Sequence, residues 1–139
     1  MSFTDVISAA IKKDIPTIKL DDTLRTAIEK MVGARTTALM VEAGGEFVGI
    51  VTDMDIMKSI SDNDDPDQTR VAKFMTACEL ITAKRTHQTP CVQLDETETV
   101  KMACGVMQLA GLHNILVTGK DDKPVGFVST ADLFKLAIS

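Results

Sequence analysis

The stretch GIVTDMDI, residues 49–56, returns in nearly the same form as GFVSTADL, residues 126–133. Each copy begins with a glycine and apolar residues that are typical of a β-strand. Each then has a serine or threonine, two spacers and an aspartate. A hydroxyl followed three positions later by an acidic residue is close to the capping box with which many helices begin. Both stretches therefore predict a strand that runs directly into a helix.

The polar residues of the two stretches are Thr52 with Asp55 and Ser129 with Asp132, and they admit two interpretations. They can serve only as helix caps, each worth about 1 kcal/mol. The same arrangement also suits a nucleoside phosphate. A helix N-terminus and its hydroxyl can donate hydrogen bonds to phosphate oxygens, and a carboxylate one turn further on can accept them from ribose hydroxyls. The spacing alone fits both interpretations.

The sequence around these stretches is itself repeated and predicts the order β-α-β-β-α twice. In the first half the spacing of Leu24, Ala27, Ile28 and Met31 is typical of a helix, which Gly33 is expected to close. The elements expected there are strands at 16–20, 38–42 and 46–52 and helices at 21–33 and 53–60, preceded by an N-terminal helix at 4–13.

The second half answers the first. PCVQLDET at 90–97 corresponds to PTIKLDDT at 16–23. The residues that match the apolar face of the first helix are Val100, Ala103, Cys104 and Met107. The expected domain organisation is a first repeat with its N-terminal helix at 4–61, an exposed connector at 62–75 and a second repeat at 76–139. Each repeat is too small to be stable alone, so we expect the two sheets to pack face to face around one core.

Length and composition exclude several classes of protein. A hydrophobic fraction of 45% in 139 residues suits one compact unit or two small halves that share a core. The net charge of −5 argues against nucleic-acid binding, because phosphate neutralisation needs a basic face. No apolar run reaches the roughly 18 residues that cross a membrane, and residues 1–13 lack a signal-peptide pattern. We expect a cytoplasmic protein that binds neither nucleic acid nor membrane.

The three cysteines, Cys78, Cys91 and Cys104, are an odd number without a C-x-x-C pair, which argues against a structural zinc site. Cys104 is expected to fill the core, Cys91 to start a strand and Cys78 to lie in a connector. A redox role is not favoured for any of them. The acidic residues between 62 and 67 do not match a calcium loop, so no metal site is expected.

An enzyme is also not expected. The two histidines, His87 and His113, have no serine or cysteine partner in a recognisable catalytic motif, and the chain contains no P-loop and no G-x-G-x-x-G. No obligatory cofactor follows from the sequence.

The double unit, with G-apolar-apolar-Ser/Thr-x-x-Asp closing each half, resembles the tandem CBS-domain pair, also called the Bateman module. VAKFMT at residues 71–76 is similar to the V-x-x-x-M-T lead-in of that family, and the resemblance covers residues from about 4 to 138. It implies an α/β (α+β) fold of two β-α-β-β-α repeats packed sheet to sheet with pseudo-twofold symmetry.

The resemblance also implies two clefts between the repeats that take adenosine-containing ligands, such as AMP, ADP, ATP or S-adenosylmethionine. In such clefts Asp55 and Asp132 would hold the ribose hydroxyls, with Thr52 and Ser129 toward the phosphates. These ligands would be regulatory.

Further ligand contacts follow from the same resemblance. His113 takes the place of a phosphate-facing basic residue of the family, whereas the first half has Thr37 and Ala38 there, which weakens the case for phosphate binding by those positions of the first half. Ile15 and Cys91 would flank the adenine.

The leading hypothesis is a regulatory, non-catalytic module that senses an adenosine-containing nucleotide and signals through changed association. The mechanism would be a population shift, in which the ligand stabilises one packing of the halves or of two protomers. A homodimer is expected from the resemblance, and the regulated protein is unknown. The alternative is a protein-interaction scaffold of the same fold with no nucleotide ligand, in which both repeated stretches are caps only.

Overall fold

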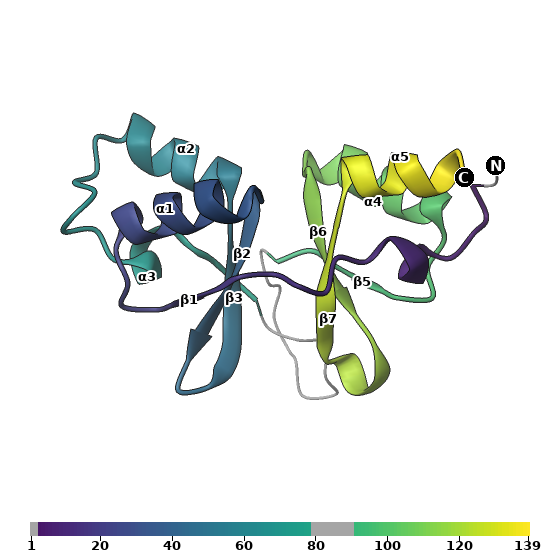
Figure 1. Cartoon of the computed structure of the whole chain (residues 1–139), viewed down its shortest axis with the longest axis horizontal. Coiled ribbons are helices and arrows are strands. Elements are labelled where there is room, and N and C mark those ends of the chain that lie inside the picture. The colour runs from purple at the N-terminus through teal and green to yellow at the C-terminus, as the bar shows by residue number, and fades with distance from the viewer. Residues whose placement is uncertain (1–2, 79–90) are drawn as a thin grey trace. The chain divides into compact units, whose positions relative to one another are not determined.

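The computed structural model describes residues 3–78 and 91–139, which form two compact units of similar construction (Figure 1). The first unit contains residues 15–78 together with Cys91, and the second contains residues 3–14 and 92–139. Each has a small β-sheet and its own helices, so the mixed α+β class predicted from the repeats is confirmed. In the described part of the chain, no helix is long and apolar enough to cross a membrane.

The elements of the first unit are β1 (Thr17–Lys19), α1 (Leu24–Ala34), β2 (Ala38–Ala43), β3 (Glu46–Thr52), α2 (Asp53–Ser61), α3 (Val71–Phe74) and β4 (Thr76–Ala77). Those of the second unit are the 3₁₀ helix η1 (Ile7–Ala10), β5 (Gln93–Asp95), α4 (Val100–Ala110), β6 (Asn114–Thr118), the 3₁₀ helix η2 (Lys120–Asp122), β7 (Pro124–Ser129) and α5 (Thr130–Ala137).

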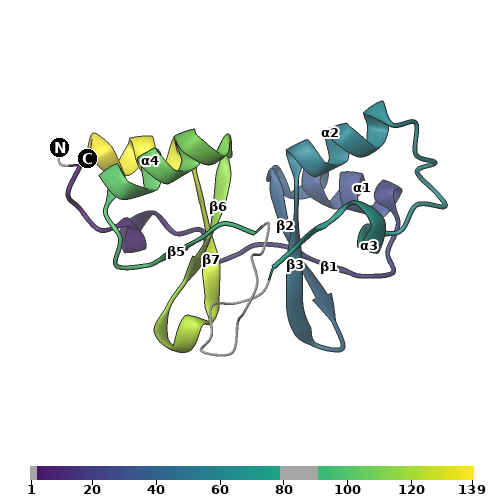
Figure 2. The same cartoon turned by 180° about the vertical axis from the view of Figure 1, so that it is seen from behind.

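The sheet of the first unit has the strand order β1-β2-β3-β4. β1 runs parallel to β2, and the other neighbours are antiparallel. α1 and α2 lie on one face of this sheet (Figures 1 and 2). Their apolar residues, including Leu24, Ala27 and Ile56, join Leu39 and Val51 of the strands in one buried cluster. The amphipathic pattern of both helices is thus explained by burial against the sheet.

The second unit repeats this plan. Its sheet has the order β5-β6-β7, with β5 parallel to β6 and β7 antiparallel to it. Val100 and Met107 of α4 and Leu133 of α5 pack in one cluster with Ile115 and Val128 of the strands. The internal repeat read from the sequence is therefore a structural repeat.

The segment after α2 completes the N-terminus of α1. Helix N-termini carry backbone N–H groups without a partner inside the helix. In the first unit the N–H groups of Leu24 and Arg25 donate to the carbonyl oxygens of Thr69 and Pro66, both at 2.9 Å. The predicted connector at residues 62–75 thus contains the short helix α3 and is bonded to the first unit.

Further along the connector, Asp64 is held in place by two donors. The buried Ser59 hydroxyl donates to one carboxylate oxygen at 2.6 Å and the Lys73 ammonium donates to the other at 2.8 Å. These hydrogen bonds, that of Lys73 first, hold the pKa of Asp64 below its usual value. The acidic composition of this segment therefore serves local structure.

The N-terminal segment plays the same part in the second unit. The N–H groups of Val100 and Lys101, the first residues of α4, donate to the carbonyl oxygens of Asp5 and Phe3 at 2.9 Å. The sequence grouped this segment with the first repeat and predicted an α-helix at 4–13. Its backbone hydrogen bonds join it to the second unit, and only Ile7–Ala10 are helical, as a 3₁₀ turn. Segments 3–12 and 66–76 are therefore structural equivalents.

Two details predicted from the sequence were wrong. Gly33 does not end α1, because the helix continues to Ala34 and closes at Arg35, whose φ of 54° is left-handed. The expected match of residues 16–23 with residues 90–97 is also shifted. Ile18 pairs with Val41 and Leu94 pairs with Val117, so β1 and β5 correspond at an offset of 76 rather than 74. Cys91 therefore occupies the place of Ile15.

The glycine of each repeated stretch allows two backbones to approach closely. A Cβ atom at Gly49 would lie 2.5 Å from the carbonyl oxygen of Thr76, and it would also collide with the Met75 side chain. At Gly126, whose φ is 154°, it would collide with the carbonyl oxygen of Lys12. Only glycine leaves room for the crossing segment in both units.

Candidate functional site

The strand-to-helix junction of the first unit is a complete capping box. The Thr52 hydroxyl accepts from the Asp55 N–H at 3.3 Å, and an Asp55 carboxylate oxygen accepts from the Thr52 N–H at 2.9 Å. Thr52 and Asp55 therefore form the predicted helix cap of the first unit. Thr52 is buried and Asp55 is half-buried, so the carboxylate is fixed in direction at the N-terminus of α2.

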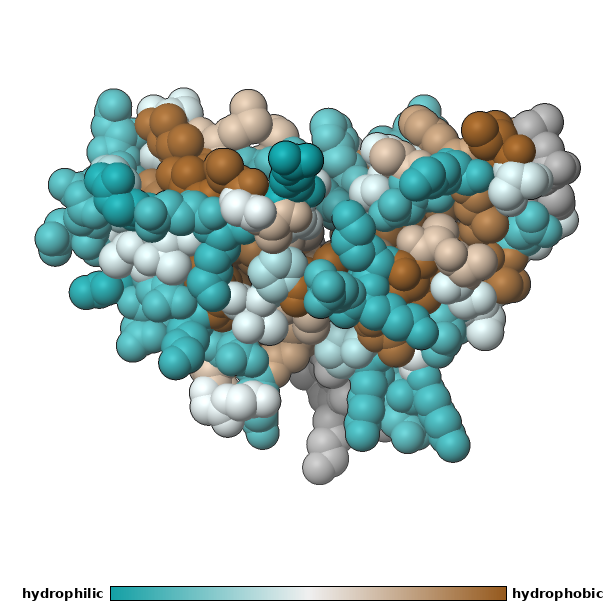
Figure 3. All heavy atoms as spheres, viewed as in Figure 1, coloured by the Kyte–Doolittle hydropathy of each residue, from teal (hydrophilic) through white to brown (hydrophobic). Residues whose placement is uncertain are grey.

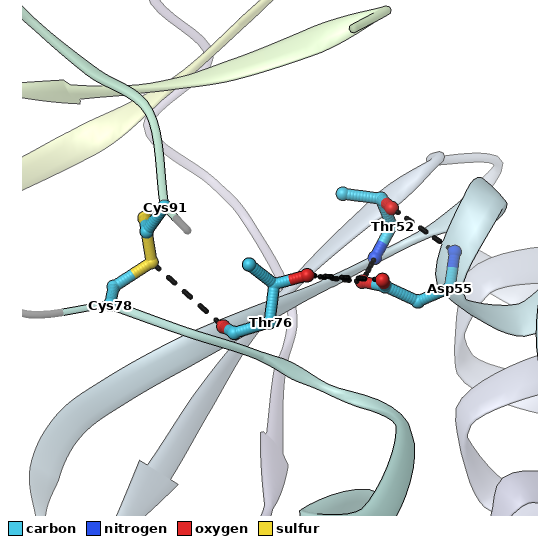
Figure 4. Close-up of a disulfide and its surroundings, with 5 residues drawn as sticks. All are labelled: Thr52, Asp55, Thr76, Cys78 and Cys91. Atoms are coloured by element: carbon cyan, nitrogen blue, oxygen red, sulfur yellow. Dashed lines mark hydrogen bonds between the residues drawn. A yellow bond between two sulfur atoms is a disulfide. The ribbon is translucent and has the colours of Figure 1, made fainter. Parts of the chain in front are cut away.

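Thr76 adds a second donor to the same carboxylate. Its hydroxyl lies 3.0 and 3.2 Å from the two Asp55 oxygens and donates to them from the neighbouring strand β4 (Figure 4). Thr76 closes the stretch VAKFMT, but no pattern in the sequence marked it as a site residue. With the Thr52 N–H and the Thr76 hydroxyl, two fixed donors orient Asp55. A carboxylate has about four lone-pair sites, so acceptor capacity remains for a ligand.

The charge of Asp55 is affected by its surroundings. Burial raises the pKa of this carboxyl above its ordinary value of 3.8, and the nearby charge of Asp53 acts in the same direction. Hydrogen bonds from Thr52 and Thr76 lower the pKa and offset part of this rise. A perturbed carboxyl at a helix N-terminus is a feature of binding sites as well as of caps.

The second unit has the same box. The Asp132 N–H donates to the Ser129 hydroxyl at 3.2 Å, and Asp132 accepts from the Ser129 N–H at 3.3 Å and from the Ser129 hydroxyl at 2.8 Å. The structure thus brings both predicted pairs together in the predicted way. Both pairs lie at the start of a helix, and Ser129 and Asp132 are half-buried.

Asp132 lines a surface pocket of about 510 Å³ that also has two cationic side chains. Lys12 reaches its rim from the N-terminal segment and Lys135 from the next turn of α5, and Ile11 and Leu136 supply apolar lining. Lys12 pairs with Phe127 as Thr76 pairs with Ile50 in the first unit, so Lys12 is the counterpart of Thr76. Lys12 could not be found from the sequence, because the pairing of the N-terminal segment with β7 is a tertiary feature, whereas Lys135 lies only three positions after Asp132 on the same helix.

His113 lies elsewhere in the second unit. Its carbonyl oxygen accepts from the Thr130 N–H at 3.1 Å, and its exposed side chain lines a separate pocket of about 320 Å³ together with Thr130, Leu133 and Phe134. Thr37 makes the corresponding backbone contact in the first unit. His113 is therefore near Ser129 in the fold, but it does not line the pocket of Asp132.

Cys91 and Cys78 form a disulfide, with their Cα atoms 4.8 Å apart. This is a correction to the expectation that the cysteines are separate apolar or connector residues. The odd number of cysteines and the absence of a C-x-x-C pair gave no signal for it. Ile15, the counterpart of Cys91, is half-buried, and Cys104 is the free cysteine.

Among the described residues, no group of three or more histidine, cysteine, aspartate or glutamate side chains is placed to hold a metal ion. Each unit therefore has a hydroxyl and a carboxylate at a helix N-terminus, and in the second unit Lys12 and Lys135 line the same pocket as the carboxylate. It can accept hydrogen bonds from a diol and, in the second unit, attract an anion.

Comparisons with known proteins agree with this architecture. The family model for the CBS domain matches residues 5–62 and 83–139. Arabinose 5-phosphate isomerase KpsF of Escherichia coli is 26% identical over 127 residues, which are 91% of this chain and 35% of that protein. The chain thus spans about a third of the length of this relative.

Solved structures show the same fold. An uncharacterized conserved protein from Pyrococcus horikoshii superposes with a TM-score of 0.80 at 21% identity, covering 100% of this chain and 96% of that chain. The CBS domain pair of protein MJ0100, solved with 5′-methylthioadenosine and S-adenosyl-L-methionine, has a TM-score of 0.74 at 18% identity, covering 96% and 95% of the two chains. With two matches of the family model that together span most of its length, the chain belongs to the CBS domain family.

Proposed function

We propose that this chain is a regulatory module that binds an adenosine-containing nucleotide, with Asp55 and Asp132 accepting hydrogen bonds from ribose hydroxyls. The observation that carries the proposal is the repetition of one arrangement. Both units place a carboxylate and a hydroxyl, from Thr52 or Ser129, at a helix N-terminus. The CBS domain pair of MJ0100, which holds two adenosine compounds, supports the ligand class.

The second unit is the better candidate for a charged ligand. Lys12 and Lys135 line the pocket of Asp132, so a phosphate or another anionic group would find cations beside the acceptor of the ribose. The first unit has the neutral Thr76 where the second has Lys12. His113 remains a predicted phosphate contact from a neighbouring pocket. Ile15 and Cys91 remain predicted neighbours of the adenine, although the disulfide limits how Cys91 can move.

Signalling through changed association is part of the proposal. Several large apolar side chains are exposed on α2 and α5, and Figure 3 shows apolar side chains at the surface among the helices of each unit. On α2 these are Met54, Met57 and Ile60, and on α5 they are Phe134, with Ile138 just beyond the helix. Contiguous exposed apolar groups mark association surfaces. We propose a homodimer that forms through such faces, with a second protein as the regulated partner.

No catalytic role is proposed. The isomerase named among the relatives is about three times longer than the matched region, so its activity is not transferred to this chain. A cytoplasmic location is also part of the proposal. In that compartment disulfides are uncommon and mostly catalytic or redox-sensing, so the bond between Cys78 and Cys91 would point to a redox role.

A scaffold without a nucleotide ligand is the second candidate. Both capping boxes are complete within the protein, so the repeated form of the two stretches can be explained by local stability alone. Thermal unfolding of the purified chain with AMP, ADP, ATP and S-adenosylmethionine distinguishes the two. A ligand at about 100 times its Kd stabilises the folded state by about 2.7 kcal/mol and raises Tm by roughly 5 °C. The regulatory proposal expects such a rise with at least one compound, and no rise with any compound would support the scaffold.

A further inference from the structure

The disulfide occupies a particular place in the chain. Cys91 is the counterpart of Ile15. Cys78 is the counterpart of Asp14, because Cys78 lies two positions after Thr76 and Asp14 lies two positions after Lys12, the counterpart of Thr76. Asp14 and Ile15 are consecutive, so one peptide bond joins the N-terminal segment, residues 3–14, to the start of the first repeat. Cys78 and Cys91 are separated by 13 positions, and the disulfide joins them directly. The S–S bond therefore makes the connection that a peptide bond makes in the other half.

The disulfide is connected to the carboxylate of the first unit through Thr76 (Figure 4). β4 consists only of Thr76 and Ala77, and the Cys78 N–H extends it with a hydrogen bond of 3.1 Å to the carbonyl oxygen of Val48. Thr76 donates to Asp55 from this short edge strand. A bond that fixes the position of Cys78 therefore also fixes the Thr76 hydroxyl, which orients Asp55.

We propose that Cys78 and Cys91 are a reversible redox site that sets the ligand affinity at Asp55. The inference rests on the proposed function, because it concerns the ligand of that carboxylate. The step is thiol–disulfide exchange with a small-molecule disulfide such as oxidised glutathione. The thiolate of one cysteine attacks the disulfide and releases one small-molecule thiol. The second cysteine then attacks the mixed disulfide and releases the other. Two protein thiols are oxidised, one disulfide is reduced, and the two protons end on the released thiols.

The oxidised form is the tighter binder. With Cys78 bonded to Cys91, β4 is held by its hydrogen bonds to β3 and by the covalent bond at its end. Thr76 therefore keeps Asp55 in one orientation. Reduction removes the covalent anchor at the end of this two-residue edge strand, and short edge segments of this kind open readily. A ligand must then order Thr76 and Asp55 as it binds, which lowers its affinity. Loss of one orienting hydrogen bond corresponds to about a five- to tenfold change.

The test is isothermal titration of the full chain with ATP and S-adenosylmethionine as probes, in oxidised and reduced glutathione buffers. The Asp132→Asn background is used so that binding reports on Asp55. The oxidised protein is expected to bind about five- to tenfold more tightly. The double variant Cys78→Ser/Cys91→Ser is expected to bind as the reduced protein does in both buffers, and Cys104→Ser is expected to retain the full redox difference.

Two variants of Thr76 test the route of the effect. Thr76→Val, which lacks the hydroxyl, is expected to bind weakly and equally in both redox states, whereas Thr76→Ser is expected to keep the difference. Alkylation followed by mass spectrometry measures the disulfide itself, with one reactive thiol expected in the oxidised buffer.

Several results would overturn the inference. These are equal affinities in the two buffers, three reactive thiols under oxidation, and a redox effect that survives Thr76→Val. Binding by the wild type but not by the Asp132→Asn protein in either buffer would remove the redox role and leave the proposed function in place. No binding by the wild type in either buffer would remove both.

Discussion

Lys12 occupies in the second unit the place that Thr76 occupies in the first. Each pairs with the strand of its repeated stretch, at the residue after the glycine. Thr76 pairs with Ile50 of β3, and Lys12 pairs with Phe127 of β7. The two units thus combine the same carboxylate with different partners. The first has a neutral donor, and the second has a cation on the rim of its pocket.

This difference predicts that the second unit distinguishes ligands by their phosphates. Lys12→Met is expected to weaken ATP binding about five- to tenfold while leaving adenosine binding nearly unchanged, because it removes a charge without removing a ribose contact. Titration calorimetry with both ligands measures it. Lys13→Met is the matched control, since Lys13 is exposed and does not line the pocket. Equal losses for ATP and adenosine, or an equal effect of the control, would contradict this role.

The raised pKa of Asp55 predicts a pH dependence of stability. Burial raises it above 3.8, so the folded protein binds this proton more tightly than the unfolded chain does. The resulting stabilisation is fully present below pH 3.8 and is lost as the pH rises through the folded pKa. Asp55→Asn stays neutral and keeps an acceptor for Thr52. As the pH rises from 3.8 through the folded pKa of Asp55, the free energy of unfolding of this variant is expected to increase relative to that of the wild type. Urea unfolding at a series of pH values measures this, and parallel profiles would contradict it.

The close approach at Gly49 predicts a large effect of a single methyl group. Gly49→Ala is expected to lower the free energy of unfolding by about 1–3 kcal/mol, because the Cβ atom would collide with the backbone of β4. Gly33→Ala is the matched control. Gly33 lies inside α1 with open space around it, so alanine there is expected to stabilise by about 0.5–1 kcal/mol. Chemical denaturation of both variants measures the contrast, and a neutral Gly49→Ala would show that the crossing segment moves freely.

The disulfide is expected to stabilise the fold independently of any ligand. It closes a loop between residues 13 positions apart, and the loop-closure entropy of such a loop corresponds to about 3 kcal/mol. Reduction should therefore lower the midpoint of urea unfolding, and Cys78→Ala/Cys91→Ala should show the lower midpoint in both redox buffers. The same midpoint for oxidised and reduced wild type would mean that the bond does not constrain the unfolded chain.

Local patterns in the sequence were sufficient to predict the repeats, the strand-to-helix junctions and both capping boxes. These features depend on residues within a few positions of each other, such as Thr52 and Asp55. The end of α1 was missed because Arg35 adopts a left-handed conformation that glycine would normally supply.

Contacts between distant segments could not be predicted in this way. Thr76 lies 21 positions from Asp55, and Lys12 is separated from Asp132 by almost the whole chain. The Cys78–Cys91 bond was missed for a similar reason, because an odd number of cysteines does not show which of them pair. The partners that distinguish the two carboxylates all come from crossing segments, whose course is set by tertiary packing.

Ribose recognition by the two aspartates is the central claim, and a cycle that alters both sides of the contact tests it most directly. The measurement is the affinity of ATP and 2′-deoxy-ATP for the wild type, Asp55→Asn and Asp132→Asn. Hydrogen bonds to charged groups contribute about 1.5–3 kcal/mol, so the wild type is expected to prefer the ribonucleotide by tenfold or more. This preference should disappear in the variant that lacks the responsible carboxylate, because the two changes remove the same interaction. A preference that persists in the double variant Asp55→Asn/Asp132→Asn, or binding that neither single variant weakens, would show that these aspartates are helix caps only.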